Sequence, residues 1–133
     1  MSSRAEDAAA RAIVDAIRAA FPEEVAHIDP ALSRDGYVEA HHIWVERFSQ
    51  CTTDAIRRGD QSKAASHLKL LSALLNRGDE ATRRCIDVAY VESLMWDIKD
   101  EKIKHAGWKL IPENLKSLYL AMWGEKTFMR GEK

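Results

Sequence analysis

The chain has 133 residues, of which 46% are hydrophobic and 31% charged, with Gly 6 and Pro 3. This length and composition predict one globular domain and exclude a disordered, collagen-like or linker-dominated protein. The formal net charge is -1, so the strong positive charge that is typical of nucleic-acid and anionic-membrane binders is missing. We therefore expect no direct nucleic-acid binding.

The two cysteines, Cys51 and Cys85, are far apart in the sequence and both lie in apolar helical patterns. This arrangement favours reduced core thiols of a cytoplasmic protein. The N-terminal segment carries charged residues every few positions, so it resembles neither a signal peptide nor a membrane span. We expect a cytoplasmic protein that does not engage a membrane.

Hydrophobic periodicity predicts helices along most of the chain. The first covers residues 5–20, where Ala and Ile recur at spacings of three and four. Pro22 is expected to end this helix and to open a short turn. Residues 29–36 contain Asp-Pro and Asp-Gly pairs, and they are expected to form the main loop of the N-terminal half.

Four further helices complete the prediction. The clearest pattern covers residues 37–58, and two more cover residues 60–76 and 79–96. The segment 79–96 is apolar on nearly all sides, so it is expected to be the central, most buried helix. A final helix is predicted over residues 112–123, while residues 97–110 are expected to be turn-like. The expected core includes five of the side chains on these helices: Trp44, Leu68, Leu71, Ala89 and Leu94.

Arg-Gly-Asp occurs twice, at residues 58–60 and 77–79. We interpret both copies as helix joints, in which Gly59 and Gly78 take the left-handed conformation that ends a helix and the following Asp caps the next one. Such short joints predict antiparallel neighbours. The expected fold is therefore all-α, a single-domain antiparallel bundle of about five helices.

Charge is divided unevenly along the chain. Residues 1–60 carry 11 acidic and 7 basic side chains, whereas the remaining residues carry 10 acidic and 13 basic. An acid-rich surface of this kind could fill a basic cleft on a partner. The candidate partner-binding residues cluster at the end of the first predicted helix, in the following turn and at the start of the long helix, and they are expected to be exposed: Glu23, Glu24, Asp29, Asp35 and Glu39. Their positions are equally explained by ordinary helix-start and turn preferences.

One cluster suggests a metal. Glu39, His42 and Glu46 share one helical face, and Glu-x-x-His is the fragment that carboxylate-bridged di-iron bundles use. Such a site needs a full set of carboxylate and histidine ligands from four helices, which this single helical face does not supply, so we expect no metal and no cofactor. A small metal-binding bundle or enzyme that uses these three residues together with Glu92 is kept as an alternative hypothesis.

Signatures of catalysis are missing from the sequence. There is no Gly-x-Ser-x-Gly, no phosphate-binding Gly-rich loop, and no His within one helical turn of either Cys. We expect no catalytic residues and no enzyme activity.

Asp87 and Glu92 lie in the most apolar predicted helix, where a carboxylate needs a basic partner or a hydrogen-bond donor. We interpret both as structural polar residues.

The order of several short motifs is recognisable: Phe21-Pro22-Glu23, Gly36-Tyr37-Val38-Glu39, Ile86-Asp87-Val88, Glu92-Ser93-Leu94 and Ile111-Pro112-Glu113-Asn114. Together they resemble a bacterial family of small all-helical domains of unknown function, whose members are often regarded as immunity proteins encoded beside polymorphic or contact-dependent toxins. The resemblance spans about residues 15–124.

The resemblance implies a protein that inhibits a cognate toxin by direct binding, and it transfers no partner-binding residue because such families vary their partner surfaces. A structural adaptor that dimerises is a further alternative. The sequence carries no signal for the oligomeric state.

Overall fold

A computed structural model describes residues 2–37 and 40–130, and within that part every regular element is helical. The all-α class is therefore confirmed for these residues. They form seven α-helices, a π-helical segment (η1) and a 3-10 helix (η2), so the expected count of about five was too low. The elements are α1 (Ser2–Ala20), α2 (Pro22–Asp35), α3 (His41–Arg58), α4 (Gln61–Arg77), α5 (Glu80–Cys85), η1 (Ile86–Val91), α6 (Glu101–Leu110), α7 (Glu113–Trp123) and η2 (Thr127–Arg130).

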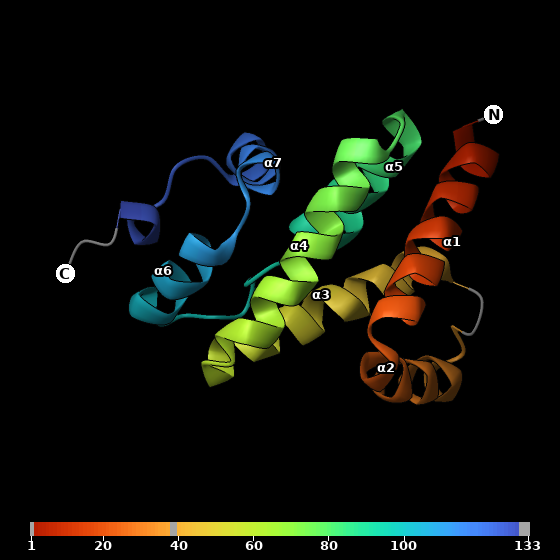
Figure 1. Ribbon diagram of the computed structural model, residues 1–133, viewed down its shortest axis with the longest axis horizontal. Helices are drawn as coiled ribbons and strands as arrows, with labels where there is room; N and C mark the ends of the chain where they lie inside the picture. The colour runs from red at the N-terminus through yellow and green to blue at the C-terminus, as the bar shows by residue number, and fades with distance from the viewer. Residues whose placement is uncertain (1, 38–39, 131–133) are drawn as a thin grey trace.

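Figure 1 shows how the elements are arranged in space. Helices α1 and α2 lie at one end of the molecule, and α6, α7 and η2 lie at the other. Helices α3 and α4 cross the middle, α1 packs on α3 and α5, and α3 packs in turn on η1 and α4. No helix of the described residues has the length and apolar character needed to cross a bilayer.

The core is one contiguous cluster centred on α3. The Phe48 ring packs against Phe21, His67 and Tyr90, with ring centroids 5.8, 4.4 and 6.0 Å away. Burying a side chain of this size contributes about 1.5–3 kcal/mol. The five residues expected in the core are all buried, which confirms that part of the prediction: Trp44, Leu68, Leu71, Ala89 and Leu94.

The N-terminal half contains a helix where a loop was expected. Helix α2 continues through Pro30 and ends at Gly36, which has φ 83°. Proline removes one backbone hydrogen bond inside a helix. Pro30 lies on the exposed side of α2, where water can replace the missing bond. The expected loop at 29–36 was wrong because a solvent-facing proline is tolerated there.

The two Arg-Gly-Asp joints differ from each other. Gly59 has φ 79° and ends α3 as predicted, and Asp60 caps α4 by accepting from the Lys63 amide at 3.2 Å. Asp79 likewise caps α5. Gly78, however, has φ -85°, so the predicted left-handed conformation is wrong there. Glycine is needed at this position for another reason, because a Cβ atom would overlap Thr82 Cγ2.

The predicted helix 79–96 is shorter and less regular than expected. After α5 the chain widens into the π turn of η1, in which the Glu92 amide donates to the Asp87 carbonyl five residues back. The Ser49 hydroxyl donates to the Tyr90 carbonyl at 2.7 Å. Turns then follow from Glu92, and Met95 has φ 60°. This bend ends the helix before Trp96.

The segment expected to be turn-like contains helix α6. The Asp100 side chain caps it by accepting from the amides of Lys102 and Ile103 at 2.9 and 3.2 Å. The helix buries Trp108, which contacts Tyr119 of α7. A charged N-terminal turn concealed this amphipathic helix in the sequence. The long helix predicted from residue 37 begins at His41 instead.

Candidate functional site

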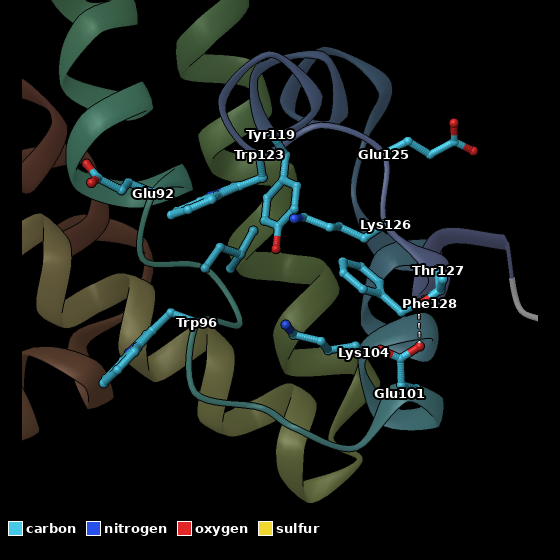
Figure 2. Close-up of a pocket in the computed structure, with 11 residues that line it drawn as sticks. Glu92, Trp96, Glu101, Lys104, Tyr119, Trp123, Glu125, Lys126, Thr127 and Phe128 are labelled. Carbon is cyan, nitrogen blue, oxygen red and sulfur yellow. Dashed lines mark hydrogen bonds between the residues drawn. The ribbon is translucent and has the colours of Figure 1, made fainter.

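The largest of the described cavities lies between the turns after η1 and the C-terminal elements, with a volume of about 580 Å³. We call it the tryptophan groove (Figure 2). A shallower depression of about 340 Å³ shares Glu92, Trp96 and Trp123 with it and extends the hollow to Glu46 and Val88. The groove is lined by Glu92, Leu94, Trp96, Glu101, Lys104, Tyr119, Trp123, Glu125, Lys126, Thr127 and Phe128.

Two tryptophans form the exposed edge of the groove. Trp96 is 65% exposed and Trp123 is 43% exposed. The left-handed conformation of Met95 turns Trp96 outward, and the Met95 amide is fixed by donating to Thr53 Oγ1 at 2.8 Å. The Trp96 indole donates to Gln50 Oε1 at 2.9 Å. The Trp96 ring is therefore held in place although its surface is open to solvent.

The other end of the groove is a rigid aromatic cluster. Trp108, Tyr119 and Phe128 contact one another edge to face, with centroid separations between 5.6 and 6.3 Å. This is the favourable geometry for aromatic quadrupoles. Phe128 docks the C-terminal segment on α6, and His105 Nδ1 lies 2.8 Å from the Phe128 carbonyl. The groove thus has one preformed wall.

The charged side chains of the groove differ in what they contact. Glu101 accepts a hydrogen bond from the Thr127 hydroxyl at 2.8 Å, and Glu125 accepts one from Arg130 at 3.2 Å. Figure 2 shows Lys104 and Lys126 extending into the groove, whereas Glu125 points away from it. The Lys104 ammonium lies 5.0 Å from the centre of the Phe128 ring. The inward-facing charges are therefore positive.

A second polar cluster lies inside the molecule around Glu24. Glu24 was expected to be exposed, but it is only 3% exposed. Its Oε2 atom lies 3.2 Å from Lys63 Nζ and 3.4 Å from His67 Nε2. On the far side of the imidazole, His67 Nδ1 is 2.9 Å from the Thr52 hydroxyl. The expectation was wrong because helix α4 brings Lys63 to Glu24, and the ammonium group offsets the free-energy cost of burying the carboxylate.

Burial by itself would raise the pKa of Glu24. The nearby Lys63 ammonium and the Cys51 thiol, together with the positive charge close by, outweigh this effect, so the pKa of Glu24 is lowered. Burial lowers the pKa of His67, and Lys63 acts in the same direction against the opposing charge of Glu24. Glu24 therefore stays ionised and His67 neutral near pH 7. The cluster therefore links α2 to α4 in the interior of the protein.

The remaining acidic candidates from the sequence are mostly engaged within the chain. Both carboxylate oxygens of Asp29 accept a hydrogen bond from Arg18, and one of them also accepts a hydrogen bond from the Trp44 indole, each at 2.9 Å. The Arg18 hydrogen bond is the main reason that the pKa of Asp29 is lowered. Asp35 pairs with Arg47 at 2.9 Å. Glu23 is exposed, and Glu39 lies outside the described residues.

The described residues of the metal-binding alternative do not form a ligand set. Glu39 lies outside the described residues, and His42 Nδ1 approaches Cys85 Sγ at 3.8 Å. Glu46 and Glu92 line the same shallow depression. In the described part of the chain, no three His, Cys, Asp or Glu side chains are grouped to hold a metal. Burial raises the pKa of both Cys51 and Cys85 to about 12, so neither thiol is activated as a nucleophile.

Asp87 and Glu92, which the sequence suggested as structural polar residues, have different surroundings. Asp87 is half-buried, and its Oδ1 atom has no hydrogen-bond partner among the described residues. Burial raises the pKa of Asp87, with partial opposition from Arg83. Glu92 is exposed on the edge of the tryptophan groove. The early end of the helix explains why Glu92 is not buried.

Apart from Glu92, sequence reasoning missed the residues of the groove, which come from separate segments. The available signal was the spacing of tryptophans, because three of the four lie between residues 96 and 123.

The chain thus has a small all-helical fold with an aromatic groove on one side. Residues 14–124 match the family described as "Domain of unknown function (DUF7674)", and the protein belongs to that family. Neither the curated proteins nor the solved structures contain a match.

Proposed function

We propose that the protein is a non-catalytic binding protein that neutralises a cognate bacterial toxin by direct binding, and that the tryptophan groove is its contact surface. The supporting observation is the pair of exposed indoles, Trp96 and Trp123, on the edge of a preformed hollow. Tryptophan is enriched among the residues that contribute most to protein interfaces. The resemblance to immunity proteins gives the partner its class.

The neighbouring apolar surface extends this contact area. Val88 lies in the depression that continues from the groove and is 43% exposed. Contiguous exposed apolar surface with a charged rim is typical of interaction sites rather than of an inert protein surface. The rim includes the exposed residues Glu46 and Glu92. An aromatic centre with a polar edge is the usual anatomy of a protein interface.

The acidic surface of α2 is a weaker candidate for the same role. Asp29 and Asp35 already pair with Arg18 and Arg47, and Glu24 is buried with Lys63. A partner that used these carboxylates would have to compete with the existing contacts. Among the described residues of this group, Glu23 is exposed and has no ion pair. The groove needs no such rearrangement, which favours it as the toxin-binding site.

Co-expression with a toxin provides the test. The toxin domain encoded beside the gene is expressed with the wild-type chain or with a Trp96→Ala/Trp123→Ala variant, and growth and Kd are measured. Truncating two interface tryptophans at about 2 kcal/mol each should weaken binding roughly a thousandfold and abolish protection. The matched control is Tyr37→Ala/Leu120→Ala, which removes side chains of similar exposure outside the groove, 45% and 40%.

Retained protection by the tryptophan variant would contradict the groove as the contact surface. Absence of protection by the wild-type chain would contradict the function. Sedimentation of the purified protein addresses the adaptor alternative: a dimer that the same two substitutions dissociate would favour an adaptor, because the groove would then be occupied by a second copy.

A further inference from the structure

The two lysines of the tryptophan groove lack an acidic partner in the described part of the chain. Lys104 comes from α6 and Lys126 from the segment after α7, and both extend into the hollow (Figure 2). No ion pair joins either of them to a carboxylate within residues 2–37 and 40–130. The two carboxylates nearest in sequence, Glu101 and Glu125, contact Thr127 and Arg130 instead.

A hydroxyl group accompanies the two ammonium groups. Tyr119 lines the groove and is 5% exposed, and in Figure 2 its hydroxyl points toward the side where the lysines end. Among the described residues this hydroxyl makes no hydrogen bond. Burial raises the pKa of Tyr119, so the hydroxyl keeps its proton and can donate. Two ammonium groups and a phenol form a donor set that suits a carboxylate.

We propose that the groove binds an acidic segment of a partner protein, with an Asp or Glu carboxylate between Lys104, Lys126 and Tyr119 and the adjoining apolar side chains on Trp96 and Trp123. This assignment rests on the proposed function, because it gives the chemistry of the segment that the groove would accept. It also fixes which end of the hollow the carboxylate occupies, because Glu46 and Glu92 at the other end repel a carboxylate.

A protein segment fits the groove better than a small organic acid. Most of the Trp96 side chain is exposed to solvent, and the hollow continues past Trp123 to Val88. A small acid held by the lysines would leave this apolar surface in water. A peptide with aliphatic or aromatic residues next to its acidic residue covers both parts.

Selection from a random dodecapeptide display library with the full-length chain tests the proposal without a toxin. We expect enriched peptides to carry Asp or Glu beside an aliphatic or aromatic residue. An enriched peptide is then synthesised and titrated while tryptophan fluorescence is followed. Lys104→Glu/Lys126→Glu should weaken its binding at least about tenfold, whereas the equal charge change in Lys99→Glu/Lys109→Glu, outside the groove, should leave Kd within about twofold.

A second arm changes the peptide instead of the protein. Replacing its acidic residue by the corresponding amide should weaken binding to the wild-type chain as much as the lysine reversal does, and this result does not depend on how the variants fold. Enrichment of peptides without acidic residues, no enrichment at all, or equal loss in the control variant would overturn the proposal. Benzoate binding as tightly as the peptide would overturn it in favour of a small-molecule site.

The two proposals fail in different ways. Peptide selection that succeeds while the co-expressed toxin is not neutralised would contradict the function and leave the acidic-segment assignment standing. Toxin neutralisation that depends on Trp96 and Trp123 but not on Lys104 and Lys126 would contradict the assignment alone.

Discussion

Glu24 and His67 face each other in the interior of the protein, with Oε2 and Nε2 3.4 Å apart. The imidazole packs against the rings of Phe21 and Phe48, whose centroids lie 4.7 and 4.4 Å away. Lys63 approaches the same carboxylate oxygen from α4. A charge in such surroundings is stable only while its partners remain. The contact therefore couples the position of α2 to that of α4.

Substitution of Glu24 tests this coupling. Glu24→Gln keeps the shape of the side chain and removes the charge that Lys63 and His67 face. We expect the free energy of unfolding to fall by about 1–3 kcal/mol, as for other buried polar groups that lose a partner. Urea denaturation followed by far-ultraviolet circular dichroism measures the change. Glu23→Gln is the control, because Glu23 is exposed, and equal losses in both variants would refute the buried ion pair.

The protonation of His67 predicts a pH dependence of stability. Its pKa in the folded protein is lowered from 6.5 by burial. As the pH falls through 6.5, the unfolded chain therefore binds a proton at this residue before the folded chain does. Stability should therefore decrease as the pH falls from about 7.5 to about 5.5, by at most about 1.4 kcal/mol per pH unit for this group. This decrease in stability should be smaller in the His67→Gln variant. The His27→Gln variant should show the same decrease as the wild-type chain, because His27 is exposed. Parallel pH profiles for the two variants would contradict the assignment.

The two glycine joints should respond differently to Asn. At Gly59, where φ is 79° and no atom lies near the position of a Cβ, Asn should cost less than Ala because Asn tolerates the left-handed region. At Gly78 any Cβ meets Thr82 and the Leu74 carbonyl, so Ala and Asn should both cost about 1–3 kcal/mol. Thermal unfolding of the four variants measures this. A clear advantage of Asn over Ala at Gly78 would show that the joint is left-handed in solution.

Truncation of Leu71 measures the central core. Leu71 is fully buried in α4, so Leu71→Ala should destabilise the protein by about 2–5 kcal/mol through lost burial and the cavity left behind. Leu120→Ala makes the same chemical change on the exposed side of α7, where about 0.5 kcal/mol or less is expected. Denaturant midpoints of the two variants should differ accordingly, and similar midpoints would place Leu71 outside the core.

Periodicity predicted α1, α3, α4 and α7 because their apolar faces are complete within one segment, but it missed α2 and α6. Leu68 and Leu71 on α4 were predicted correctly for this reason, and the caps at Asp60 and Asp79 were predicted from the local sequence of the two joints. The wrong expectation for Glu24 has a different cause, which lies elsewhere in the chain. The burial of Glu24 depends on Lys63, which is far away in sequence.

The groove was unpredictable for a related reason. The π turn and the left-handed Met95 change which side chains face outward after residue 91. A helical projection of residues 79–96 therefore places Trp96 wrongly. Trp123 and Lys126 meet this turn only through tertiary packing. The acidic candidates on α2 could be found as charges, but not as residues already paired with Arg18 and Arg47.

Met95 has a further consequence for recognition. A non-glycine residue at φ 60° stores backbone strain, and the Thr53 hydroxyl and the Trp96–Gln50 hydrogen bond keep the chain in that conformation. The entropy of ordering the Trp96 side chain is therefore lost during folding rather than during association. A partner would meet an indole that is already oriented, so complex formation would cost less conformational freedom than docking on a mobile loop.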